Sequence, residues 1–164
     1  MRKFAYAFLF ALAAVLALSA CNKGQQNEQA AQPQQVTRPS SPNDMKGWKA
    51  YLSQIVQANM QGINNTPYMY FIPAGDDPDT VAARGRTQDT LNGVVATTVL
   101  PGNMIAAGGP DSSKTADALV TAFKNAQPGS FKGVVVLFVG DAADKARVQQ
   151  AVAPSGAEFR FAQM

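Results

Sequence analysis

The sequence predicts an α/β domain, a small layered sandwich in which helices cover both faces of a mainly parallel sheet of about four strands. Helical patterns alternate with short apolar runs from residue 45 to the C-terminus. The strongest run, residues 133–139 (GVVVLFV), is apolar throughout, as expected for a parallel strand covered on both faces. Three of the strand-like runs lead into glycine and then into a helix start, which is typical of βα units with right-handed crossovers.

The first two predicted elements are a helix over residues 45 to about 60 and a strand over residues 68–72. Large apolar residues recur at helical spacing through the first segment, and Asp44 precedes it as an N-cap. Residues 68–72 (YMYFI) are apolar on both faces, which indicates a buried strand rather than a solvent-exposed edge.

A second helix and a second strand follow. The turn AGDDP supplies an N-cap and a proline at the first helical position, which predicts a helix from Pro78 to about Val95. Two glycines inside this helix weaken the pattern. A Pro-Gly turn then precedes a strand over residues 104–107. An alternative makes residues 94–100 and 104–107 a hairpin around that turn.

The last third of the chain predicts two further helix–strand pairs. Residues 112–126 form a helix that leads to the strand over residues 133–139. Residues 141–152 form the next helix, with Asp141 as its N-cap. In residues 157–161, phenylalanines alternate with charged residues, which predicts a half-exposed strand at the edge of the sheet.

The N-terminal residues have the pattern of a targeting signal. Two basic residues precede an uncharged apolar run from Phe4 to Leu18, which is short for a membrane span and typical of a cleaved secretory signal. The run ends in Leu-Ser-Ala-Cys, which resembles the lipobox of bacterial lipoproteins. This resemblance implies that residues 1–20 are removed and that Cys21 is acylated. The alternatives are a signal peptide cut elsewhere and an uncleaved single-span anchor.

The residues after the lipobox predict the location and the domain boundaries. Asn22 stands where lipoproteins retained in the inner membrane usually have Asp, so the resemblance implies the outer membrane, facing the periplasm, in a Gram-negative host. Residues 21–44 comprise the acylated cysteine and a Gln-, Pro- and Ser-rich stretch, which we expect to be a disordered tether. Residues 45–164 are expected to form one periplasmic domain.

Composition excludes several classes of function. Without Arg2 and Lys3, 12 basic residues face 11 acidic ones, and this net charge of +1 gives no reason to expect nucleic-acid binding. The chain has no histidine, which excludes Ser-His-Asp and Cys-His catalysis and removes the usual nitrogen ligands of zinc. The acidic residues at 76–79 are attributed to helix capping, because no distal glutamate completes a calcium loop. We therefore expect no catalytic residues, no metal and no cofactor.

A candidate ligand site lies at the carboxyl edge of the sheet, where three strand–helix loops are expected to meet. The stretch 108–115 (GGPDSSKT) resembles a phosphate-binding P-loop, but Ser113 replaces its second glycine and Pro110 lacks an N–H group. Weak anion binding is expected there instead of nucleotide hydrolysis. The candidate residues are Gly108, Gly109, Ser112, Ser113 and Lys114. Alternatively, nearby carboxylates cap the free N–H groups and leave no capacity for a ligand.

Four aromatic residues and an arginine pair have simpler interpretations. We expect most of Trp48, Tyr51, Tyr68 and Tyr70 to pack in the core, with an aromatic recognition surface as the alternative. Residues 84–86 (RGR) are expected on a solvated helix face.

These features favour a lipid-anchored envelope lipoprotein with a non-enzymatic binding or interaction domain. Its partners would be the membrane, through the lipid, and an envelope protein or small ligand. One version is an inhibitor or immunity-type lipoprotein that neutralises a toxin in the periplasm. The competing class is a periplasmic enzyme that uses carboxylates and Lys114 at the edge of the sheet, and a carboxylate of raised pKa there would favour it.

Overall fold

The computed structural model describes residues 37–97 and 99–164. The predicted signal peptide, Cys21 and most of the predicted tether lie outside these residues. The compact unit that contains the described residues extends from Gln35 to Met164. Within the described ranges, no helix has the length and apolar character needed to cross a membrane.

In the described part of the chain, four helices alternate with four strands, and every pair of neighbouring strands is parallel. The strands follow one another across the sheet in the order β1-β2-β3-β4. This confirms the predicted α/β class with a parallel sheet. The elements are α1 (Met45–Ala58), β1 (Tyr68–Phe71), α2 (Pro78–Ala96), β2 (Met104–Gly108), α3 (Ser112–Phe123), β3 (Val135–Gly140), α4 (Ala142–Val152), the 3-10 turn Ala153–Ser155 and β4 (Glu158–Gln163).

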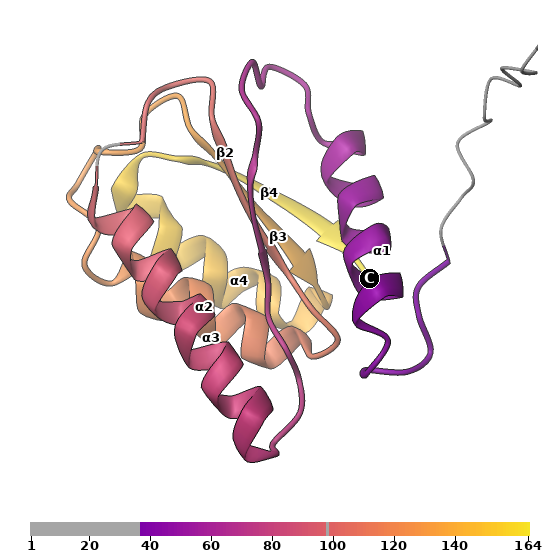
Figure 1. Ribbon diagram of the computed structural model, residues 1–164. Helices are drawn as coiled ribbons and strands as arrows, with labels where there is room; N and C mark the ends of the chain where they lie inside the picture. Colours follow the sequence, from indigo (N-terminus) through magenta and orange to yellow (C-terminus); the bar gives the residue numbers. More distant parts are fainter. Residues whose placement is uncertain (1–36, 98) are drawn as a thin grey trace, which may run out of the picture. The chain divides into compact units, whose positions relative to one another are not determined.

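The order of the strands determines which helices cover which face. Each crossover moves one strand in the same direction, and crossovers of one hand then place α2, α3 and α4 on the same face of the sheet. The α1 helix precedes the first strand and packs on the opposite face (Figure 1). Helices therefore lie on both faces, as predicted, but one face has three helices and the other has one.

Two apolar clusters hold these layers together. On the side of α2–α4, Val136 and Phe138 of β3 belong to the same buried cluster as Leu119 of α3. On the other side, Leu52 of α1 belongs to a second cluster with Leu137 of β3. All six residues of β3 are buried, which confirms that this apolar run is a central strand.

The position of β1 corrects the expectation of a buried strand. This strand has only β2 as a neighbour, and Tyr68 and Met69 are 44% and 42% exposed, although Tyr70 and Ile72 are buried. A run of apolar residues indicates that both faces of a strand are covered. It does not indicate whether a second strand pairs with each of its edges. The predicted closing edge strand is confirmed as β4.

The alternative hairpin before β2 is wrong. Residues 94–96 complete α2, and β2 pairs in parallel with β1 and β3. The glycines within α2 did not end the helix, because Leu91 and Val95 anchor it in the core. The expectation that most of the four aromatic residues pack in the core holds for two of them: Trp48 is 2% exposed and Tyr70 is buried. Tyr51 is half-buried and Tyr68 faces solvent.

Candidate functional site

The three strand–helix loops lie at the same edge of the sheet because all four strands run parallel. Two polar side chains of α3 link these loops. Lys114 reaches the loop between β1 and α2, and Ser112 reaches the loop between β3 and α4. The predicted site residues are therefore placed together with neighbouring loops, and the contacts determine how much of each side chain is free for a ligand.

Lys114 is held by acceptors of the first loop. Its ammonium donates to Asp76 Oδ1 at 2.7 Å and to the carbonyl oxygen of Ala74, and it lies 4.0 Å from a carboxylate oxygen of Asp111. The hydrogen bond and the charge of Lys114 lower the pKa of Asp76, and Arg84 adds to this effect. The sequence predicted that the positive charge of Lys114 would bind an anionic ligand. In the structure, this charge is already paired with the carboxylate of Asp76.

Arg84 supports the same loop, which corrects its expected place on a solvated face. Its Nη1 donates to the carbonyl oxygens of Pro73 and Gly75, each at 2.9 Å, and its guanidinium lies 3.7 Å from Asp76. Carbonyl acceptors in an irregular loop carry no sequence signature, so this role could not be found from residue types alone.

Ser112 joins α3 to α4. Its side chain is buried, donates to Asp144 Oδ2 at 2.5 Å and accepts from the main-chain N–H of Asp141 at 2.8 Å. Asp141 occupies the N-cap position of α4, but its own side chain makes no capping hydrogen bond. The hydroxyl of Ser112 therefore serves the packing of two helices.

Arg147 completes this connection between α3 and α4. Its guanidinium donates to Asp144 Oδ1 at 2.9 Å, to Asp117 Oδ1 at 2.5 Å and to the carbonyl oxygen of Ser113 at 2.9 Å. Burial alone would raise the pKa of Asp144, but hydrogen bonds from Ser112 and Arg147, with the charge of Arg147, lower it overall. The hydrogen bond from Arg147 to Asp117 is the main reason that the pKa of Arg147 is raised.

The two glycines of the P-loop-like stretch have a packing role. A Cβ atom on Gly109 would lie 2.1 Å from the carbonyl oxygen of Ile72, and one on Gly108 would lie 2.4 Å from Leu52 Cδ2. Asp111 caps α3 by accepting from the N–H of Lys114 at 3.0 Å. The cap on α3 matches the alternative in which carboxylates occupy the free N–H groups, whereas Asp141 does not cap α4. Anion binding by the five candidate residues stays a prediction.

Asp144→Asn is expected to lower the free energy of unfolding at pH 7 by about 1–3 kcal/mol, since hydrogen bonds to a charged group are lost. The wild-type carboxylate has a lowered folded-state pKa, so its stabilisation is present above the unfolded pKa of about 3.9 and is lost as the pH falls through the folded value. The variant should therefore lose less stability between pH 7 and about pH 3. Urea unfolding at both pH values measures this, and Asp89→Asn, at an exposed position of α2, is the control. Equal acid sensitivity in the wild type and Asp144→Asn would contradict the assignment.

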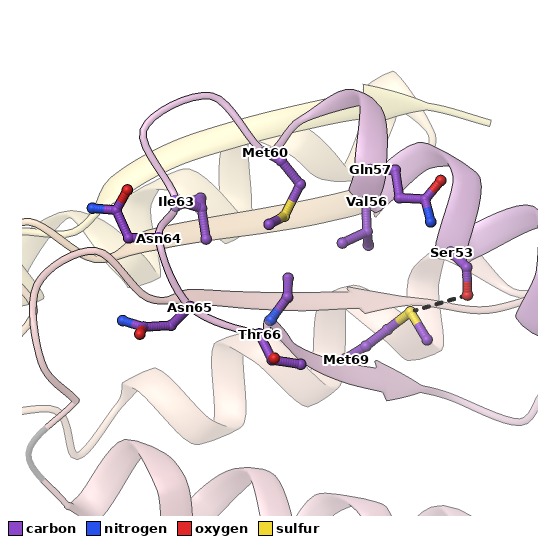
Figure 2. Close-up of a pocket in the computed structure, with 10 residues that line it drawn as sticks. Ser53, Val56, Gln57, Met60, Ile63, Asn64, Asn65, Thr66 and Met69 are labelled. Carbon is purple, nitrogen blue, oxygen red and sulfur yellow. Dashed lines mark hydrogen bonds between the residues drawn. The ribbon is translucent and has the colours of Figure 1, made fainter.

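A second candidate site is a hollow of about 530 Å³ beside α1, on the face opposite α2–α4 (Figure 2). Its lining combines apolar side chains with uncharged polar ones. Met69 of β1 forms part of the wall and accepts a weak hydrogen bond from Ser53 Oγ at 3.8 Å. The lining residues are Ser53, Val56, Gln57, Met60, Ile63, Asn64, Asn65, Thr66, Pro67 and Met69.

Sequence reasoning did not single out this hollow. The available signal was the number of helices: between residue 37 and the first strand the chain has one helix, so one is left to cover that face. Apolar Met60 and Ile63 in the segment between α1 and β1 were a second signal.

Across residues 37–97 and 99–164, no three side chains of His, Cys, Asp or Glu are grouped so that they could hold a metal ion. No protein family matches the chain, and neither a curated protein nor a solved structure matches it significantly.

Proposed function

We propose that this chain is an envelope lipoprotein, anchored to the outer membrane by an acylated Cys21, whose periplasmic α/β domain binds a partner without catalysing a reaction. The observation that carries the proposal is the apolar run that ends in Leu-Ser-Ala-Cys. In this arrangement the segment after Cys21 is a spacer between the membrane and the domain.

The geometry of the carboxyl edge supports binding rather than acid–base catalysis. A general acid that works near neutral pH needs a raised carboxyl pKa. Asp76 and Asp144 show the opposite direction, because Lys114 and Arg147 stabilise their ionised forms. Lys114 and Arg147 are themselves held in these ion pairs. The carboxylates and the lysine that a catalytic site at this edge would use therefore stabilise the fold instead.

The hollow beside α1 is a second feature that supports binding. All ten residues that line it are uncharged, and about half of them carry an amide or hydroxyl group. Such a surface offers apolar contact and hydrogen bonds, which are the requirements of a recognition site.

Mass spectrometry of the protein isolated from native membranes tests the anchor. We expect a mature chain that begins at Cys21 and carries a diacyl or triacyl mass on it. Cys21→Ser should release the protein from the membrane or leave the precursor uncut. A mature chain with an unmodified Cys21 would overturn the proposal.

A second variant tests the prediction that the protein is sorted to the outer membrane. Asn22→Asp places the usual inner-membrane retention residue after the acylated cysteine. It should move the protein from outer-membrane to inner-membrane fractions on a density gradient, with acylation unchanged. An unchanged distribution would contradict the outer-membrane assignment.

A further inference from the structure

The outer edge of β1 is an open pairing edge. Ile72 donates its N–H to the carbonyl oxygen of Gly108 at 2.9 Å, and alternate residues of a strand direct their main-chain groups to the same side. The main-chain groups of Met69 and Phe71 therefore point away from β2. The segment that contains β1 runs down the near side of the sheet in Figure 1. Within the described part of the chain, only β2 pairs with this strand.

The two edges of the sheet differ in charge. The other edge strand, β4, carries Glu158 and Arg160, whose side chains form an ion pair at 2.7 Å. Charged side chains on an edge strand oppose pairing with another chain. The sequence of β1 is Tyr-Met-Tyr-Phe, and it has no such charge. Its edge is therefore open to a further strand, over a short length bounded by Pro67 and Pro73.

The hollow beside α1 adds side-chain contacts to this edge. Met69 belongs both to the edge strand and to the wall of the hollow. Because no lining residue is charged, a charged occupant would lose water without gaining an opposite charge. The amides of Gln57 and Asn65 can donate to and accept from an extended main chain, whereas a helix satisfies its own main-chain groups. An uncharged, apolar, extended segment fits these conditions.

We propose that β1 of a second copy of this chain occupies this edge, in a two-fold antiparallel pair. The β1 strand is itself an extended, uncharged and apolar segment, which is the kind of occupant that its edge and the hollow require. A two-fold axis through the pair would let Met69 and Phe71 of each copy exchange main-chain hydrogen bonds with the other. It would also cover the exposed side chains of Tyr68 and Met69. The two sheets would then continue into one.

The small contact area implies that the membrane assists the pairing. A stable interface between free proteins buries about 1,200–2,000 Å² in total, and a four-residue strand with one hollow falls short of this. Anchoring both copies to one membrane raises their effective concentration. This part of the inference rests on the proposed function, because it requires the lipid at Cys21.

Photo-crosslinking of the full-length chain in its membranes tests the pair. A photoreactive amino acid is placed at position 68, and at position 100 as a control, since Leu100 is an exposed apolar residue outside β1. Two versions with different C-terminal tags are expressed together. We expect an adduct of twice the chain mass that carries both tags from position 68, and none from position 100.

Substitutions at the edge then test its chemistry. Met69→Lys places like charges close together across the two-fold axis and should lower the yield of the adduct at least about fivefold. Met69→Leu and Leu100→Lys should leave the yield unchanged. Resistance of the domain to limited proteolysis shows that each variant is folded. Because the surface is uncharged, the yield should also be insensitive to salt.

The outcomes separate this inference from the proposed function. Absence of the doubled adduct from membrane-bound, acylated protein would overturn the pairing and leave the anchor intact. An adduct with a different protein would overturn self-pairing and retain a binding domain. Equal yields from positions 68 and 100, or from the wild type and Met69→Lys, would also overturn it. A loss of adduct in Cys21→Ser, restored at high protein concentration, would support the role of the membrane.

Discussion

Val136→Asp is expected to abolish the folded domain. Val136 lies on the central strand β3, is fully buried, and is flanked by Ile105 of β2 and Phe159 of β4. An unpaired carboxylate at this place costs several kcal/mol, which is comparable to the whole stability of about 5–15 kcal/mol of a small domain. The single tryptophan, Trp48, is buried in the α1 layer, so its fluorescence and the far-UV circular dichroism should both report unfolding.

The matched control for this variant is Val81→Asp. Val81 lies on α2 and is 45% exposed, so the same substitution should change the free energy of unfolding by no more than about 0.5 kcal/mol. Denaturant unfolding of the three proteins makes the comparison. A soluble Val136→Asp protein with the wild-type midpoint would refute the central position of β3.

Gly109→Ala is expected to destabilise the domain by about 2–4 kcal/mol, a large effect for one methyl group. The added Cβ would lie 2.1 Å from the carbonyl oxygen of Ile72. The obstacle is main chain, so it cannot rotate away as a side chain can. The end of β1 must move from the end of β2, which weakens the hydrogen bond from Ile72 to Gly108.

Gly85→Ala is the control for the glycine series. A Cβ on Gly85 meets nothing within 4 Å, and the residue lies within α2. Alanine should therefore stabilise the helix by about 0.5–1 kcal/mol. Opposite signs at the two positions, measured by urea unfolding, are the expected result. A neutral Gly109→Ala would show that the two strand ends separate at no cost.

Local residue patterns in the sequence were sufficient to predict the helices, the strands and the fold class. The apolar run of β3 and the caps at Asp44 and Asp77 depend on residues within a few positions of one another, and all three features are present in the structure. Asp141 stands at the predicted N-cap position of α4, but its side chain makes no capping hydrogen bond. The alternation of helices and strands then leaves few arrangements other than a parallel sheet. The expected lipid anchor at Cys21 is equally local, and it lies outside the described residues.

The candidate site could be predicted only in part. That three loops meet at the carboxyl edge follows from parallel strands, and the structure has them there. Which side chains are free could not be predicted, because the partners are distant in the chain: Ser112 and Asp144 are 32 positions apart, and Lys114 and Asp76 are 38 apart. Such pairs depend on how far each helix extends over its neighbour.

By itself, the sequence determined the alternation of helices and strands and the absence of histidine chemistry, and it favoured a parallel sheet over the hairpin alternative before β2. Only the tertiary structure decided that β1 lies at an edge, that Arg84 and Arg147 hold loops and helices together, and that a hollow opens beside α1. The physical reason is the range of the interactions. Periodicity and capping act between near neighbours, whereas edges and hollows depend on the order of the strands and on the number of helices that cover each face.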